Sequence, residues 1–233
     1  MPKTALNHSL CRVNYGKRTS FGGSQTESCK KRIQGYGCGV VAASEVLVYL
    51  WRGKAEKEKS TAGDSGLALI LSRMMTDPVT AENYNSLVDY IEKKYLHVIP
   101  NFGITGISLA SALNRMFLKL SLPYCAVWSV GERKLFQNME TMLQNNIPVI
   151  ISAGPGLPFI RKKESLPLYR PGNTLRSAAG AKEHYMTATA IDGEFIYLSS
   201  WGNEYIVRKQ DFIDYVKRCS NFITSNIVLI RKK

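Results

Sequence analysis

The spacing of hydrophobic and polar residues changes near the middle of the chain. Up to about residue 120, apolar residues recur every three or four positions, the period of an amphipathic helix. This pattern predicts helices over residues 38–51, 66–75, 81–95 and 108–118. Beyond it, short apolar runs separated by turn residues predict mainly strands. The expected strands are 124–130, 147–153, 184–191, 195–200, 204–208 and 222–230, and the expected helices are 132–145 and 210–219.

The first expected helix, residues 38–51, is apolar on nearly every side, and such a helix belongs at the centre of a fold. A helical first half followed by antiparallel strands predicts an α+β architecture. Residues 1–33 are rich in Lys, Ser, Thr and Gly, and we expect an irregular N-terminal extension there. The remaining residues, 34–233, are expected to form one domain, in which residues 154–182 make a long functional or mobile loop.

The formal net charge of +13 would draw the protein toward anionic partners such as nucleic acid, lipid head groups or cell-wall polymers. The basic residues fall in separate groups at 30–32, 54–59, 161–163 and 231–233. Such dispersal favours solvated surface charge, with an anionic surface or polymer as the alternative partner. No nucleic-acid-binding motif accompanies these groups, so no specific nucleic-acid partner is expected.

The apolar runs are short. None approaches the roughly 20 residues that a membrane span needs, so we expect no transmembrane segment. The N-terminus lacks the apolar stretch of a secretory signal. This leaves open a cytoplasmic protein, or a secreted one whose leader is missing from the given sequence.

The five cysteines show none of the spacings of a structural zinc site, and we expect no metal or cofactor. Cys125 and Cys219 lie in apolar or helical patterns and are expected to be small buried side chains. Cys11 and Cys29 could form a bridge in an oxidising compartment. The odd number of cysteines and the position of Cys38 favour a reduced nucleophile over a disulfide framework.

Cys38 lies where a glycine-flanked turn becomes the start of a helix. The unpaired N–H groups and the positive end of the helix dipole at that point favour a thiolate. Far downstream, His184 opens an expected strand. A nucleophile at a helix start and a base on a later sheet is what Cys–His catalysis requires. Taken singly, Cys38 could instead be an inert packed cysteine, and His184 an ordinary sheet histidine.

Several motifs occur together in one order. They are Tyr36-Gly37-Cys38-Gly39, Gly106-Ile107-Ser108-Leu109, Asn145-Asn146-Ile147-Pro148-Val149-Ile150, the run from His184 to Gly193, and Ser199-Ser200-Trp201-Gly202. Over residues 34–216 the chain resembles the papain-like cysteine peptidase superfamily, and most of all its bacterial double-glycine leader peptidase-like branch. The resemblance implies an N-terminal helical lobe whose nucleophile helix packs on a C-terminal antiparallel sheet lobe.

The resemblance implies a role for each matched residue. Cys38 would be the nucleophile, and His184 would take its proton and later protonate the leaving amine. Gln34 would donate its amide to the oxyanion beside the backbone N–H of Cys38, with Gln25 as the alternative donor. The implied substrate contacts are Tyr36, Gly37 and Trp201.

The chain departs from the family at the third catalytic position. The family carries Asn or Asp two residues before the Trp-Gly pair, where this sequence has Ser199. A serine hydroxyl can accept the imidazole N–H, but it carries no charge and orients the ring more weakly. Asn203 and Ser200 are the alternative orienting residues.

These features predict a thiol hydrolase that cleaves a peptide or isopeptide bond in a peptide or protein substrate through an acyl-enzyme. One alternative is an acyl or amide transferase that uses the same two residues. The other is a catalytically weak binding module for an anionic partner, which the serine at the third position favours.

Overall fold

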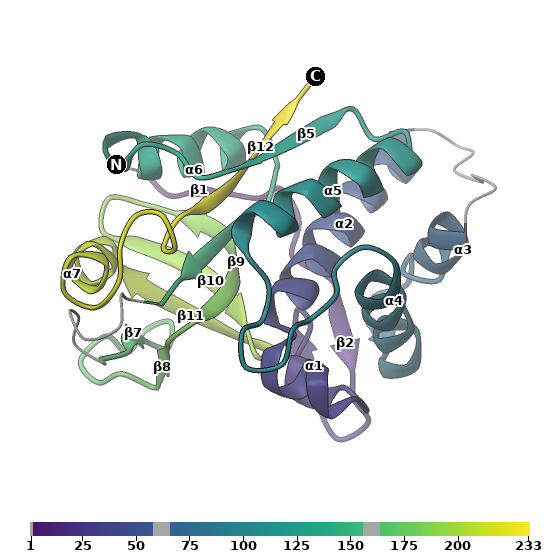
Figure 1. Cartoon of the computed structure of the whole chain (residues 1–233), viewed down its shortest axis with the longest axis horizontal. Helices are drawn as coiled ribbons and strands as arrows, with labels where there is room; N and C mark the ends of the chain where they lie inside the picture. Colours follow the sequence, from purple (N-terminus) through teal and green to yellow (C-terminus); the bar gives the residue numbers. More distant parts are fainter. Residues whose placement is uncertain (1, 58–65, 156–163) are drawn as a thin grey trace.

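The computed structural model describes residues 2–57, 66–155 and 164–233, and it has a mixed α+β architecture. The first five helices gather on one side of the molecule, and the main sheet lies beside them, flanked by the last two helices (Figure 1). The helices are α1 (Lys31–Tyr36), α2 (Cys38–Lys57), α3 (Gly66–Ser72), α4 (Ala81–Lys94), α5 (Gly106–Lys119), α6 (Leu135–Gln144) and α7 (Lys209–Cys219).

The main sheet is antiparallel throughout, with strand order β11-β10-β9-β6-β12-β5 and with β1 paired onto β9. Its strands are β1 (Thr4–Ala5), β5 (Tyr124–Trp128), β6 (Val149–Ala153), β9 (His184–Ile191), β10 (Phe195–Ser200), β11 (Asn203–Arg208) and β12 (Ile227–Lys232). Except for β1, these strands overlap the predicted ones, because each is a short apolar run between turn residues; β12 begins at Ile227 and not at residue 222. The sheet therefore confirms the α+β expectation.

Helix α2 runs through the centre of the molecule. Its residues from Val40 to Trp51 are all buried, and it packs against β9, β6, α4 and α5. The helix continues through Gly53 to Lys57 instead of ending near Trp51. The prediction of a central buried helix is confirmed, and Cys38 is its first residue.

The N-terminal segment differs from the irregular extension that was expected. Besides β1, it contains β2 (Arg12–Asn14), β3 (Thr19–Phe21) and the short 3-10 helix η1 (Gln25–Glu27). Strands β3 and β2 form a small sheet with β4 (Val79–Thr80). The segment is ordered in this way because Leu10, Cys11 and Val13 are buried in the core.

The expected long loop also contains regular structure. Strands β7 (Leu166–Leu168) and β8 (Ala179–Ala181) pair antiparallel within residues 154–182. Residues 156–163, including the basic group 161–163, lie outside the described residues, as do Glu58 and Lys59 of the group 54–59.

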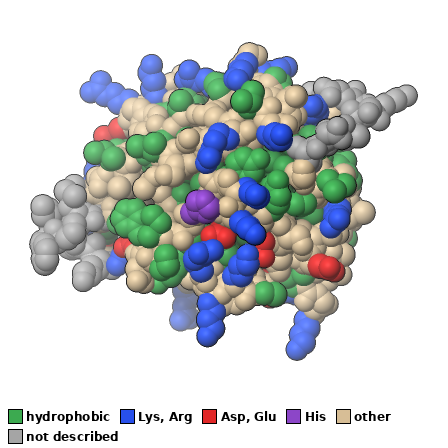
Figure 2. All heavy atoms as spheres, turned by 45° about the vertical axis from the view of Figure 1, so that its right-hand side comes forward, with side chains coloured by type: hydrophobic (Ala, Val, Ile, Leu, Met, Phe, Trp, Pro, Cys, Tyr) green, Lys and Arg blue, Asp and Glu red, His purple; other side chains and the backbone are tan. Residues whose placement is uncertain are grey.

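The net charge of +13 is spread over many side chains on the face shown in Figure 2. Lys and Arg side chains are scattered over the face seen in Figure 2, with hydrophobic and acidic side chains between them. Within the described ranges, no helix has the length and apolar character to cross a membrane. All five cysteines are free thiols; Cys11 is buried and Cys29 is exposed, so these two form no bridge.

Candidate active site

The start of α2 depends on close contact with α1. The Gly37 N–H donates to the Ile33 carbonyl (2.8 Å), and a Cβ on Gly37 would lie 2.6 Å from that same oxygen. A glycine is therefore required for α1 to pass directly into α2 at Cys38. Tyr36, at the end of α1, donates its hydroxyl to Asn101. Neither Tyr36 nor Gly37 lines the cavity described next.

Cys38 and His184 line one small cavity between the start of α2 and strands β9 and β10. Gln25, Glu45, Ser200 and other residues complete its wall. The free volume among these side chains is about 10 Å³, close to what a single water molecule requires. A reacting carbonyl would have to meet Cys38 at the rim of this cavity.

His184 is held from two directions. Its Nε2 lies 2.7 Å from the Ser200 hydroxyl, and its ring stacks on Trp201 with centroids 4.2 Å apart and planes at 15°. Glu183, just before His184, has φ 51°, and Trp201, just after Ser200, has φ 48°. Left-handed backbone at non-glycine residues is strained, and such strain clusters at functional sites.

Ser200, not Ser199, contacts the imidazole. Both serines line the cavity, but their hydroxyls have different partners. The Ser199 hydroxyl instead lies 2.8 Å from Glu45 Oε1 and 3.1 Å from the Phe21 carbonyl. The Asn203 amide donates to the Trp201 carbonyl (3.0 Å), which leaves Ser200 as the residue on His184.

The amide in the cavity belongs to Gln25 and not to Gln34. Gln34 is exposed, and its Nε2 donates to the Ser28 carbonyl (2.6 Å). Gln25 is buried, lines the cavity beside Cys38, and donates from Nε2 to the Gln34 carbonyl (2.8 Å). A carboxamide nitrogen carries two N–H groups, so this bond leaves one of them for another acceptor.

Burial opposes charge on both Cys38 and His184. It raises the pKa of the Cys38 thiol, although the backbone N–H groups of Tyr185, Gly39 and Cys38 itself act in the opposite direction. Burial also lowers the pKa of His184 to about 3. The helix N-terminus was expected to favour a thiolate at Cys38, but burial outweighs it. The resting pair is therefore an uncharged thiol beside an uncharged imidazole.

Glu45 is the site residue that the sequence reasoning missed. It is 3% exposed on the inner side of α2, and burial raises its pKa to about 7. Hydrogen bonds from the Ser199 hydroxyl and the Gly23 N–H oppose that rise. The sequence does mark this residue, because Glu45 is the single charged residue in the otherwise uncharged run 38–51 of an apolar helix.

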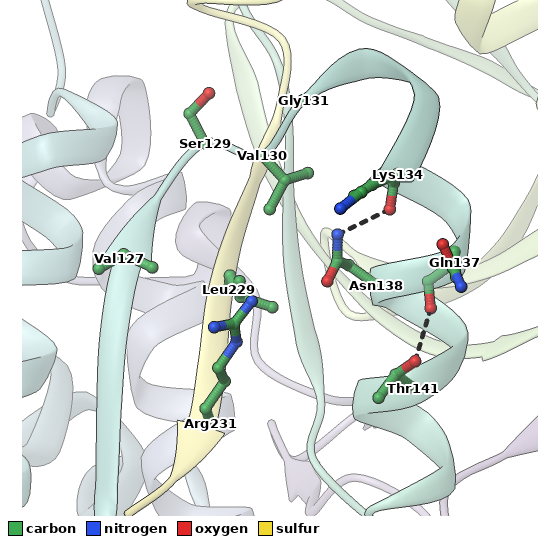
Figure 3. Close-up of a pocket in the computed structure, with 10 residues that line it drawn as sticks. All are labelled: Val127, Ser129, Val130, Gly131, Lys134, Gln137, Asn138, Thr141, Leu229 and Arg231. Atoms are coloured by element: carbon green, nitrogen blue, oxygen red, sulfur yellow. Dashed lines mark hydrogen bonds between the residues drawn. The ribbon is translucent and has the colours of Figure 1, made fainter.

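A second hollow lies away from Cys38, between the edge strand β5, its neighbour β12 and helix α6 (Figure 3). Val127 and Leu229 lie on its strand side, and Asn138 and Thr141 bond back to their own helix on the other. None of the predicted site residues lines it. Across the described ranges, no three His, Cys, Asp or Glu side chains are grouped so as to hold a metal ion.

The chain matches no protein-family model, and no curated protein or solved structure matches it either. The functional argument therefore depends on the side chains around Cys38 and His184.

Proposed function

We propose that this protein is a papain-like cysteine peptidase, a thiol hydrolase that cleaves a peptide or isopeptide bond through an acyl-enzyme on Cys38. The observation that carries the proposal is the shared cavity of Cys38 and His184, two residues from opposite halves of the chain. Gln25 lines the same cavity as an amide donor, and Ser200 bonds the far nitrogen of the imidazole.

In the first step, the Cys38 sulfur attacks the carbonyl carbon while His184 takes the thiol proton. His184 acts through Nδ1, and Nε2 must then carry the ring proton and donate it to Ser200. The carbonyl π electrons move to oxygen, where the free N–H of Gln25 and the backbone N–H of Cys38 stabilise the oxyanion. Such a donor contributes about two to three orders of magnitude in rate.

In the second step, the C–N bond breaks and His184 gives its proton to the leaving amine, which leaves a thioester on Cys38. Water then attacks the thioester while His184 takes a proton from it. The C–S bond breaks, the sulfur regains a proton, and the carboxylic acid product leaves. Because the resting pair is uncharged, sulfur and imidazole acquire their opposite charges together during attack.

The test uses two reactions of Cys38 followed by mass spectrometry. In the parent protein we expect Cys38 to react with iodoacetamide and to form a thioester with p-nitrophenyl acetate. His184→Ala should slow both reactions at Cys38 about tenfold or more, because it removes the base. Exposed Cys29 of the same molecules is the internal control, and its rates should not change. Equal Cys38 rates in variant and parent would refute the proposed function.

The acceptor to which this thioester passes its acetyl group distinguishes a hydrolase from a transferase. We expect the acetyl group to pass mainly to water. Preferential formation of hydroxamate at low hydroxylamine concentration would instead identify an acyl transferase with the same nucleophile and base.

A further inference from the structure

A buried carboxyl group lies beneath the proposed active site. Glu45 is about two helical turns after Cys38 on α2 and lines the same cavity. None of the ion pairs found in the described part of the chain involves Glu45. A buried carboxyl group without a cation is costly unless hydrogen bonds satisfy it. What Glu45 bonds to therefore indicates what it does.

Glu45 joins two segments that border the cavity. Its Oε1 accepts from the Gly23 N–H at 2.9 Å, and the Ser199 hydroxyl lies 2.8 Å from the same oxygen. Ser199 Oγ also lies 3.1 Å from the Phe21 carbonyl, and the Phe21 N–H donates to the Gly202 carbonyl at 3.0 Å. The segment that ends in Gln25 is thus tied to α2 at Gly23 and to the end of β10 at Phe21.

The backbone of that segment packs directly onto the pair of Glu45 and Ser199. Gly22 has φ +73°, and a Cβ there would lie 2.1 Å from Glu45 Oε1 and 2.3 Å from Ser199 Oγ. A Cβ on Gly23 would lie 2.1 Å from the Tyr84 hydroxyl. Only glycines allow so close an approach. The two consecutive glycines are therefore needed for this segment to pack against the buried Glu45.

We propose that Glu45 and Ser199 are positioning residues that hold the Gln25 amide beside Cys38. The inference rests on the proposed function, in which the free N–H of Gln25 stabilises the oxyanion. Neither residue touches the reacting atoms. Each acts on the loop backbone two to four residues before Gln25, and through it on where the free N–H of Gln25 points.

The test compares two reactions of Cys38 that differ in their need for Gln25. Alkylation by iodoacetamide displaces iodide and forms no oxyanion, whereas acylation by p-nitrophenyl acetate passes through one. Glu45→Leu removes the acceptor while keeping similar bulk. We expect it to slow acylation about 10- to 100-fold and to change alkylation less than threefold. Glu45→Gln keeps an acceptor oxygen and should restore much of the acylation rate.

A double variant tests whether the effect passes through Gln25. Gln25→Ala should give the same selective loss of acylation. If Glu45 acts by placing Gln25, adding Glu45→Leu to Gln25→Ala should cause no further loss. Glu92→Gln is the matched control, since Glu92 is 2% exposed on α4 but pairs with Arg32 away from the cavity. It should leave both rates unchanged.

Several outcomes would overturn the inference. Equal slowing of both reactions by Glu45→Leu, or full additivity in the double variant, would show that Glu45 does not act through Gln25. If Glu45→Leu fails to fold by circular dichroism, Ser199→Ala carries the test: it removes the hydroxyl that bonds Glu45, it should slow acylation more than alkylation, and acylation as fast as in the parent would refute the inference. Loss of the His184 effect identifies failure of the proposed function itself, whereas a retained His184 effect without a Glu45 effect refutes only the positioning role.

Discussion

At the scale of single residues, the Cys38 thiol is subject to two opposing influences. The start of α2 supplies backbone N–H groups that favour the thiolate, and burial favours the thiol. Burial has the larger effect, as it does on His184, whose pKa falls to about 3. Two groups that each resist charge in the resting state can still exchange a proton, because the two charges then form side by side. In the proposed mechanism, His184 is therefore uncharged before attack and has a nitrogen lone pair available for the thiol proton.

The pH dependence of Cys38 alkylation checks this account. With His184 replaced by alanine, the alkylation rate should follow the ionisation of the Cys38 thiol alone. Since burial raises the pKa of Cys38 from its ordinary value of 9.0, the rate should still be rising at pH 9. The measurement is the iodoacetamide rate at Cys38 between pH 6 and 10. A plateau reached below pH 8 would indicate a stabilised thiolate and contradict the uncharged pair.

At the scale of elements, the N-terminal segment sets the geometry of the site. It pairs β1 with β9 and β2 with β4, and it delivers Gln25 to the cavity. We therefore expect Leu10→Ala to lower the free energy of unfolding by about 2–5 kcal/mol, because Leu10 is 1% exposed. Leu175→Ala, at a residue 97% exposed, should change it by less than about 0.5 kcal/mol. Urea denaturation measures both. Comparable losses for the two variants would show that the segment contributes little to the core.

The elements that the sequence predicted are those whose pattern is local. Helices α2 to α7 and the strands of the main sheet other than β1 follow from periodicity, whereas α1 and β1 were not predicted. Strands β9 and β10 bring His184 and Ser200 together as a consequence. The choice of Ser200 over Ser199 depends on how the end of β10 is aligned with His184 on β9, and this is a matter of register. The choice of Gln25 over Gln34 depends on pairing between distant segments. No local pattern carries that information.

At the scale of the whole molecule, two buried groups make opposite contributions to stability as the pH changes. The pKa of His184 is lowered from 6.5 to about 3, so the unfolded chain takes up this proton first and stability is lost as pH falls below 6.5. The pKa of Glu45 is raised from 4.5 to about 7, so the unfolded chain releases this proton first and stability is lost as pH rises above 4.5. Between about pH 4.5 and 6.5 the two effects largely cancel in the native protein.

Removing one of the two groups should reveal the effect of the other on the pH dependence of stability. In His184→Gln only the Glu45 contribution remains, so stability should fall as pH rises through this window. Each pH unit is worth about 1.4 kcal/mol, so native stability minus variant stability should increase by about 2 kcal/mol from pH 5.0 to 6.5. Urea unfolding at the two pH values measures this difference, with His97→Gln, which removes an exposed imidazole, as the control. A difference that does not change with pH would mean that His184 takes up its proton as readily in the folded protein as in the unfolded chain. Burial would then not lower the pKa of His184, and the account of its resting charge would be wrong.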